Sequence, residues 1–336
     1  MLNNNYGLGD AMIKYIYVLV SDEADYYLEQ ALMSIVSLRI HTPNAFVTLL
    51  IDNITEKSLE NKRRNILELV SELKVVEIDS RFGKKARSRW LKTSMRQHVE
   101  GDFLYIDCDT IICDDLNDVK NNDVNLGAVL ESHHSVKNHY FEKYFQNNDK
   151  ILGFNASFES NYHFNSGVIF CRDIPICHSF FKEWHRLWLF CFEKGILIDQ
   201  ASFNQANYIL ANVITELDGR WNCQIVVDGA IRYLHNAKII HYYYNSVFLD
   251  KDGAYFLANQ SILEDIKKTI TISDELENNL RNSKCLFVPN TRLVVVGKFN
   301  DSMTYHGVKK IFYSKLGGAI EFIFSAIYKY GYRFFR

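Results

Sequence analysis

The chain has 336 residues, of which 48% are hydrophobic and 23% charged, so it can bury one large or two modest cores. That composition excludes a disordered or collagen-like protein. With 38 Lys and Arg against 40 Asp and Glu, the formal net charge is −2, so we expect no binding to nucleic acid.

The 7 cysteines are widely spaced, odd in number and mostly within apolar runs, and no CxxC pair occurs. This pattern predicts neither a zinc knuckle nor a disulfide framework and favours a reducing compartment. The first residues lack the basic head and apolar stretch of a signal peptide, and no apolar run is long enough to cross a bilayer. We therefore expect a cytoplasmic protein.

The first part of the chain alternates strand-like and helix-like patterns. Apolar runs predict strands, and apolar residues at helical spacing predict the helices between them. In chain order these are strand 14–20, helix 24–40, strand 46–51, helix 57–73 and strand 74–78. Strands separated by helices imply right-handed crossovers and a mostly parallel sheet with helices on both faces.

The remaining elements continue the same plan. A basic loop and a helix through Met95 lead to further strands and helices, predicted at 103–107, 126–130, 164–171, 180–192, 200–210, 213–217 and 238–240. No Pro/Gly/Ser-rich linker interrupts them. We predict one α/β catalytic domain over 1–300, followed by a segment of different character over 301–336.

Two carboxylates follow a buried strand. The run Phe103 to Asp109 is apolar until Asp107, and alternation along a strand puts Asp107 and Asp109 on one side of the chain. Together they can hold one divalent cation at the carboxyl end of a strand, where open α/β sheets bind ligands. A second pair, Asp250 and Asp252, follows no clear strand and is interpreted as a solvated turn.

Three further sites carry polar groups at the ends of predicted elements. Asn165 and Ser166, followed by Gly167, open an apolar strand and suit hydrogen bonding to a polyhydroxylated ligand. Asp199 and Gln200 begin a predicted helix, and Asp199 is either a ligand or a simple N-cap there. His241 ends an apolar strand and can add an imidazole to a metal held by oxygens.

In this order, the motifs resemble the nucleotide-sugar glycosyltransferases of the GT-A fold, and most closely family 8, which contains retaining enzymes of the bacterial galactosyltransferase and glycogenin type. The segments that carry the resemblance are Val18 to Asp22 with Tyr26, Arg89 and Lys92, Tyr105 to Asp109, Phe164 to Val168, Asp199 with Gln200, Leu217, Arg220 to Asn222, and His241.

The resemblance implies a role for each of these sites. Asp107, Asp109 and His241 would bind Mn²⁺ or Mg²⁺, and Asp199 and Gln200 would act at the sugar. The donor, a UDP-sugar, would contact Val20, Ser21, Asp22, Tyr26, Arg89, Lys92, Asp107, Cys108, Asn165 and Ser166. It further implies transfer of a hexose to a glycan acceptor, such as lipopolysaccharide or another lipid-linked surface glycan, with retention of configuration.

One departure concerns the residues after His241. In the family this histidine is usually followed by a Gly and a Lys-Pro-Trp that clamp the leaving diphosphate, whereas here Tyr242, Tyr243 and Tyr244 follow. The clamp is therefore missing or rebuilt, for which Lys251 and the loop 81–89 are candidates.

Two other functions stay open at this point. A sugar-phosphate nucleotidyltransferase shares the sheet and the acidic metal ligands, but it needs a glycine-rich loop after the first strand, and Ser21 to Asp25 contains no glycine. A carbohydrate-binding protein fits the aromatic content of 14%, although most aromatics lie in runs that read as core.

The last segment interleaves cations with apolar and aromatic residues from Met303 to Arg336. Such a composition suits a helix in a membrane interface, because headgroups accommodate cations and aromatic rings. We predict peripheral binding to an anionic membrane on the inner face of the cell, with a helix docked on the catalytic domain or on a second subunit of a homo-oligomer as the alternative.

Overall fold

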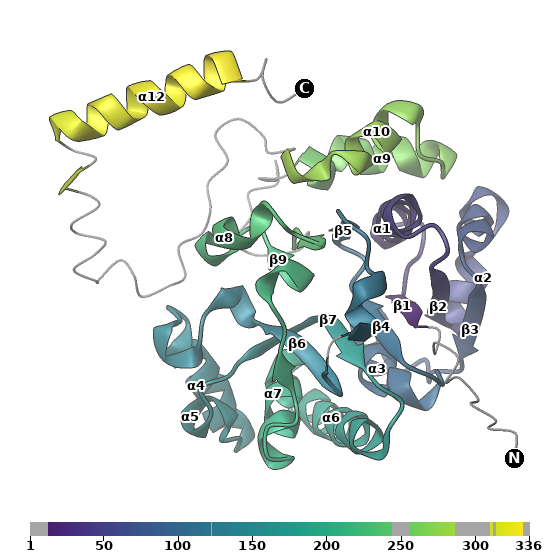
Figure 1. The fold of residues 1–336 in the computed structure, drawn as a ribbon. Coiled ribbons are helices and arrows are strands. Elements are labelled where there is room, and N and C mark those ends of the chain that lie inside the picture. Colours follow the sequence, from purple (N-terminus) through teal and green to yellow (C-terminus); the bar gives the residue numbers. More distant parts are fainter. Residues whose placement is uncertain (1–12, 122, 244–255, 286–309, 312–313, 332–336) are drawn as a thin grey trace, which may run out of the picture.

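A computed structural model describes residues 13–121, 123–243, 256–285, 310–311 and 314–331. Its centre is a seven-stranded sheet with the order β3-β2-β1-β4-β7-β6-β8 (Figure 1). The strands are β1 (Lys14–Leu19), β2 (Phe46–Asp52), β3 (Glu72–Val76), β4 (Phe103–Ile106), β6 (Leu126–Leu130), β7 (Phe164–Cys171) and β8 (Thr215–Glu216). A three-stranded sheet beside it contains β5 (Thr110–Ile112), β10 (Ile239–His241) and β9 (Cys223–Gln224), in that order.

The central sheet is mostly parallel, which confirms the predicted α/β class. Strand β1 lies between β2 and β4 and is parallel to both, and β2 is parallel to β3. Strand β7 is the exception, because it runs antiparallel to β4 and β6. Its first residues therefore lie beside the carboxyl end of β4, where the Asp107 amide donates to the Gly167 carbonyl at 2.8 Å.

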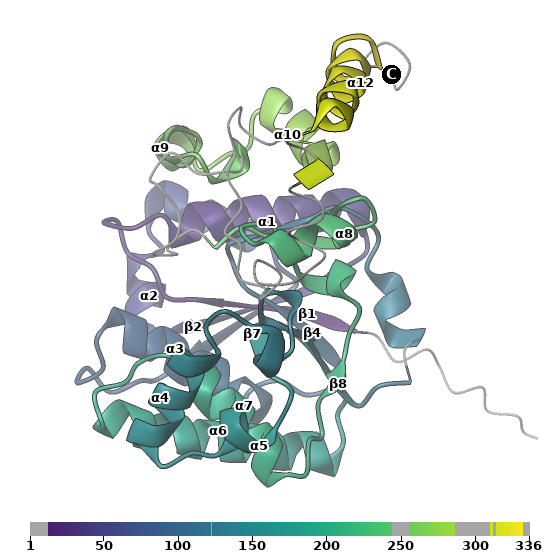
Figure 2. The same ribbon diagram turned by 90° about the vertical axis from the view of Figure 1, so that its left-hand side faces the viewer.

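Helices cover both faces of the sheet (Figure 2). The described α-helices of the chain, of which α12 lies away from the sheet, are α1 (Tyr27–His41), α2 (Asn53–Ser58), α3 (Lys84–Ser94), α4 (Glu142–Leu152), α5 (Ala156–Glu159), α6 (Pro175–Glu193), α7 (Gln200–Ile209), α8 (Ile231–Leu234), α9 (Gln260–Thr269), α10 (Asp274–Arg281) and α12 (Lys315–Gly331). Successive side chains of β1 point to opposite faces of the sheet and so belong to two hydrophobic cores. Tyr15 and Tyr17 pack with α1 on one face, and Ile16 and Val18 pack with residues of α3 and α6 on the other.

The predicted helix over 57–73 is wrong. The chain forms the short helix α2, which begins when the Asp52 carboxylate accepts the Thr55 amide at 2.7 Å. Asn61 then has φ of 49°, and a 3₁₀ segment, Asn61–Leu69, replaces the expected α-helix. A left-handed residue interrupts α-helical hydrogen bonding, so the apolar spacing did not produce one helix.

Several boundaries also differ from those predicted. Strand β3 begins at Glu72 and ends at Val76, so the expected strand 74–78 is shifted. Helix α3 already begins at Lys84, inside the expected loop 81–89. Proline at the first position starts α6 at Pro175 rather than 180.

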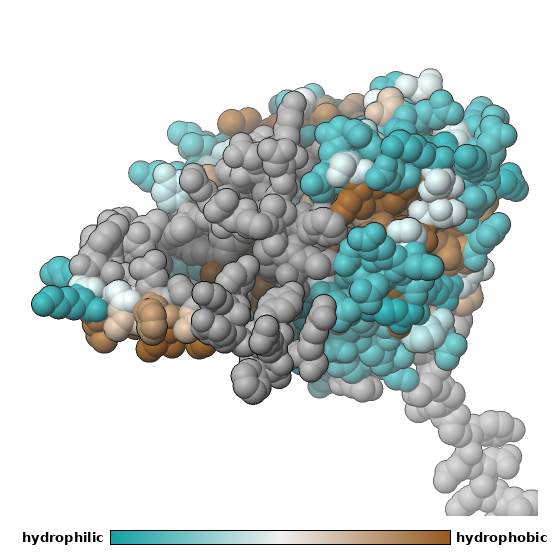
Figure 3. Space-filling model, turned by 90° about the horizontal axis from the view of Figure 1, so that it is seen from above, coloured by the Kyte–Doolittle hydropathy of each residue, from teal (hydrophilic) through white to brown (hydrophobic). Residues whose placement is uncertain are grey.

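Six cysteines are free thiols in the described part of the chain: Cys108, Cys113, Cys171, Cys177, Cys191 and Cys223. Among the described helices, none is long and apolar enough to span a bilayer. Helix α12 exposes Leu316, Phe322, Ile323 and Ile327, and Figure 3 shows apolar side chains on the surface at that end of the molecule.

Candidate active site

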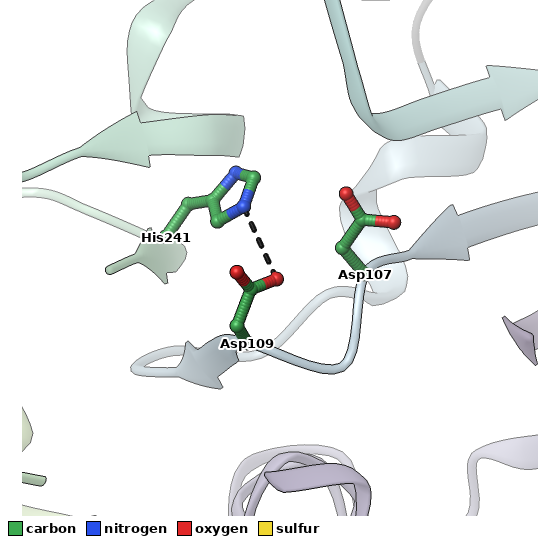
Figure 4. Close-up of side chains that lie close together, drawn as sticks. All are labelled: Asp107, Asp109 and His241. Carbon is green, nitrogen blue, oxygen red and sulfur yellow. Dashed lines mark ion pairs between the residues drawn. The ribbon is translucent and has the colours of Figure 1, made fainter. Parts of the chain in front are cut away.

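The candidate metal site lies at the junction of the two sheets. Strand β4 ends at Ile106 and β5 begins at Thr110, so Asp107 and Asp109 occupy the short connection rather than a continuous strand. Their carboxylates and the His241 imidazole converge (Figure 4), with one ligand atom of each lying within 4.8 Å of the others. His241 Nε2 is 3.3 Å from Asp109 Oδ1. The predicted convergence is present, although a turn and not strand alternation produces it.

A chain of hydrogen bonds orients His241. The Gly167 amide donates to Asn165 Oδ1 at 2.9 Å, and Asn222 Nδ2 donates to the same oxygen at 2.8 Å. Asn222 Oδ1 is therefore left to accept from His241 Nδ1, 3.0 Å away. With the proton on Nδ1, the Nε2 lone pair is directed at the carboxylates, which is the arrangement of a metal-binding imidazole.

Gly167 permits this packing. A Cβ at this position would lie 2.4 Å from His241 Cε1 and 2.8 Å from Asn165 Oδ1. Any side chain would displace the imidazole from the carboxylates. Glycine at position 167 therefore leaves room for the His241 ring.

A second group of charges lies beside Asp107. Lys92 on α3 is buried, and its ammonium is 3.1 and 3.2 Å from the two oxygens of Asp107 and 3.5 Å from Asp199 Oδ2. Arg89, one turn earlier, pairs with Asp199 Oδ1 at 2.9 Å. The Tyr105 hydroxyl donates to Asp107 as well. The two basic residues predicted to face the donor therefore connect Asp107 to Asp199.

Asp199 is not an ordinary N-cap. It precedes α7, but its side chain makes no capping hydrogen bond and instead accepts from the Ser166 hydroxyl at 2.9 Å. Burial raises the pKa of this carboxyl, and Lys92, Arg89 and Ser166 outweigh that effect and lower it to about 2. Asp199 is therefore a fixed anion that two cations hold in place.

A further group of polar side chains beside His241 is built around Glu131, which the sequence did not single out. Glu131 follows β6 and accepts hydrogen bonds from Asn165 Nδ2, at 2.8 Å, and from Gln200 Nε2. The Tyr243 hydroxyl is 2.8 Å from Asn165 Nδ2 and donates to Gln224 Oε1 at 2.6 Å. Burial raises the pKa of Glu131, but the amide hydrogen bonds outweigh it and hold the pKa below its usual value.

No local pattern marks Glu131 and Tyr243 in the sequence, because their neighbours come from distant segments. A clue was available for Asn222, which stands in the Trp-Asn segment that contributed to the resemblance. Its role as the partner of His241 emerges only in three dimensions.

The residues expected at the nucleotide form a separate cluster after β1. Val20 and Ser21 are buried, and Ser21 Oγ donates to Asp25 at 2.7 Å and accepts from Arg63 at 3.0 Å. Asp22 pairs with Lys84 of α3 at 2.5 Å. The Tyr26 ring lies 4.6 Å beneath the Lys267 ammonium of α9. These partners fix the turn to the helices on both sides of it.

Four other predicted sites remain: Cys108, the basic segment, Lys251, and the pair Asp250 and Asp252. The Cys108 thiol lies 3.4 Å from the Val18 carbonyl, and burial raises its pKa. In the basic segment, Arg81 pairs with Asp79 at 3.6 Å, whereas Arg89 faces the site. Lys251, a candidate for the missing clamp, and the pair Asp250 and Asp252 lie outside the described residues.

The chain is similar to known glycosyltransferases. Residues 101–246 match the family model described as glycosyl transferase family 8. Among curated protein sequences, none matches the chain.

Three solved structures of similar proteins are the following. The bifunctional glycosyltransferase WbbM is 16% identical, covering 84% of this chain and 53% of its own, with a TM-score of 0.48. The galactosyltransferase LgtC, in complex with donor and acceptor sugar analogs, is 14% identical over 79% of this chain and 99% of its own, with a TM-score of 0.48. The glycosyltransferase GlyE of Streptococcus pneumoniae is 17% identical over 84% of this chain and 67% of its own, with a TM-score of 0.44. The chain thus spans about half the length of WbbM.

Proposed function

We propose that the chain is a metal-dependent glycosyltransferase that moves a hexose from a UDP-sugar to a glycan acceptor, which the match of residues 101–246 to the glycosyl transferase family 8 model supports. The observation that carries the proposal is the presence of two neighbouring groups of polar side chains. In the first, which we call the metal wall, Asp107, Asp109 and His241 converge, and Lys92, Arg89 and Asp199 lie beside them. In the second, which we call the sugar wall, Glu131 accepts hydrogen bonds from the amides of Asn165 and Gln200.

The donor set fits a divalent ion. Two carboxylates and an imidazole on oriented supports suit Mn²⁺ better than Mg²⁺, because Mg²⁺ prefers oxygen ligands in strict octahedral geometry. When bound, such an ion stabilises the negative charge that develops on the departing diphosphate. Arg89 and Lys92 provide further positive charge next to Asp107.

The protein's own groups then hold the sugar. Ser166 and Gln200 carry hydroxyl and amide groups that suit sugar hydroxyls. The Asn165 amide, whose two N–H groups and oxygen are already bonded to protein groups, holds Glu131 and Asn222 in position. Asp199, held by Arg89 and Lys92 with a low pKa, is a weak nucleophile. We therefore assign it to binding and orientation and favour attack of the acceptor on the face that the diphosphate leaves, with a phosphate oxygen accepting the acceptor proton.

The direct test is hydrolysis of UDP-sugars with added Mn²⁺, followed by the same assay on Asp109→Asn. We expect slow hydrolysis by the native chain and a loss of at least about 1,000-fold in the variant, since metal charge stabilisation contributes several kcal/mol. Asp265→Asn, on the exposed Asp265–Lys268 pair, is the control. Full activity of Asp109→Asn would contradict the proposal.

Stereochemistry is tested separately. We expect an early product to keep the anomeric configuration of the donor, which the proton coupling constant reports by NMR. An inverted product would instead require a carboxylate acting as general base, for which Asp199 and Glu131 are candidates.

For the acceptor we propose a lipid-linked glycan at an anionic membrane, supported by the exposed apolar residues of α12 between lysines of the same segment. The test deletes residues 316–336 and compares flotation with anionic liposomes and donor hydrolysis in the shortened and full chains. We expect flotation to be lost and hydrolysis to persist. Unchanged flotation, or failure of the shortened chain to fold, favours a helix docked on protein.

A further inference from the structure

The inference concerns Lys92 and rests on the metal site proposed above. Lys92 is 2% exposed, and its ammonium lies 3.1 and 3.2 Å from the two Asp107 oxygens. A lysine with so little access to water is stable only when anions compensate its charge. Asp107 supplies that compensation, and Asp199 Oδ2 at 3.5 Å adds to it.

The same carboxylate is a candidate metal ligand. Both oxygens of Asp107 are within reach of Lys92, and one of them also accepts from the Tyr105 hydroxyl. A divalent ion bound by Asp107, Asp109 and His241 would thus share Asp107 with a fixed positive charge. Like charges at this range repel strongly when water is excluded, so Lys92 weakens the binding of the bare ion.

The charges around Asp107 explain why such a lysine is useful. Three carboxylates, Asp107, Asp109 and Asp199, face two cations, Lys92 and Arg89. Leaving aside the imidazole, the cluster carries one excess negative charge. A divalent ion turns this excess into one positive charge, which a negatively charged diphosphate then offsets, because the ion and both side chains attract it.

We propose that Lys92 couples the two binding events: it keeps the affinity for the free metal ion low and makes tight binding depend on the nucleotide diphosphate. The coupling is reciprocal, so the ion strengthens nucleotide binding by the same factor. The metal ion is thereby bound tightly only when the donor is bound as well.

The experiment measures Mn²⁺ affinity of the purified full chain by electron paramagnetic resonance, with and without UDP. In Lys92→Met we expect the affinity for Mn²⁺ alone to rise by about tenfold or more and the gain produced by UDP to shrink by a similar factor. Lys92→Arg retains the positive charge and should restore most of the gain.

The matched control is Lys14→Met. Lys14 is less buried than Lys92, with a side chain that is 20% exposed, and it pairs with Glu72 at 3.4 Å at the start of β1, away from Asp107. Its metal affinities should equal those of the native chain. Circular dichroism and thermal unfolding verify that each variant is folded.

The outcomes are distinct. If the native chain binds no Mn²⁺ with or without UDP, the proposed metal site is wrong. If it binds Mn²⁺ and Lys92→Met has the same affinities, or weaker affinity for the bare ion, Lys92 merely supports the structure and this inference is overturned.

Discussion

The two walls of the site use carboxylates in different ways. On the metal side, Asp107 and Asp199 contact cations, namely Lys92 and Arg89. On the sugar side, the described partners of Glu131 include the side-chain amides of Asn165 and Gln200. Cationic partners hold a carboxylate in place and neutralise its charge. Amide partners hold it without neutralising it, so it can still accept a hydrogen bond from a neutral hydroxyl group. We therefore propose that the metal wall neutralises the charge of the ion and the diphosphate and that the sugar wall binds the hydroxyl groups of the sugar.

Removing a ligand from the metal wall should have the largest effect. In His241→Ala we expect the Mn²⁺ concentration for half-maximal donor hydrolysis to rise by about 100-fold or more, because one of three ligands is lost and outer-shell changes alone cost 10- to 100-fold. UDP affinity without metal should change little. An unchanged metal midpoint would make His241 a structural residue and place the third ligand elsewhere.

Changing the sugar wall should leave the metal midpoint unaffected. Glu131→Gln keeps the size of the side chain but loses an anion that accepts from Asn165 and Gln200. A hydrogen bond to a charged group is worth about 1.5–3 kcal/mol, so we expect turnover to fall by about 10- to 100-fold. A shift in the Mn²⁺ midpoint of the same size would show that the two walls do not act separately.

The third effect concerns stability and pH. The pKa of Asp199 is lowered to about 2, so Asp199 stabilises the folded chain by about 2 kcal/mol at neutral pH. Because the folded-state pKa is the lower one, this contribution is complete above the unfolded value of about 3.8 and is lost as the pH falls toward 2. Asp199→Asn should therefore lose about 2 kcal/mol at pH 7.

Urea unfolding at a series of pH values measures this difference. We expect the gap between the native chain and Asp199→Asn to be constant from pH 7 to 5 and to close by about half near pH 3. A gap that does not depend on pH would mean that Arg89 and Lys92 do not hold Asp199 as an anion.

The sequence predicted the metal wall better than the sugar wall, for a physical reason. Asp107 and Asp109 are close in the chain and follow a strongly apolar strand, so their role depends on local pattern. The sugar wall joins Glu131 after β6, Gln200 at α7 and Tyr243 after β10. Such contacts depend on the antiparallel direction of β7, which apolar runs alone do not reveal.

The fold also divides into elements that the sequence predicted correctly and one that it did not. Apolar runs located β1, β2, β4 and β7 because these strands are buried on both faces. Over 57–73, apolar spacing predicted one helix, yet the backbone conformation of Asn61 divides the segment. Periodicity reports which residues are buried and not which of them takes a left-handed conformation.

The smallest expected effect tests the edge of the sugar wall. Tyr243 stands two residues after His241, and its hydroxyl contacts Asn165 and Gln224. Tyr243→Phe removes only that hydroxyl and keeps the ring, which lies 4.2 Å from the His241 imidazole. A neutral hydrogen bond contributes about 0.5–1.5 kcal/mol, so turnover should fall by about two- to tenfold with the metal midpoint unchanged. Steady-state donor hydrolysis at saturating Mn²⁺ measures it. If Tyr243→Phe instead shifts the metal midpoint, the phenol acts through the His241 ring, and Tyr243 belongs to the metal wall.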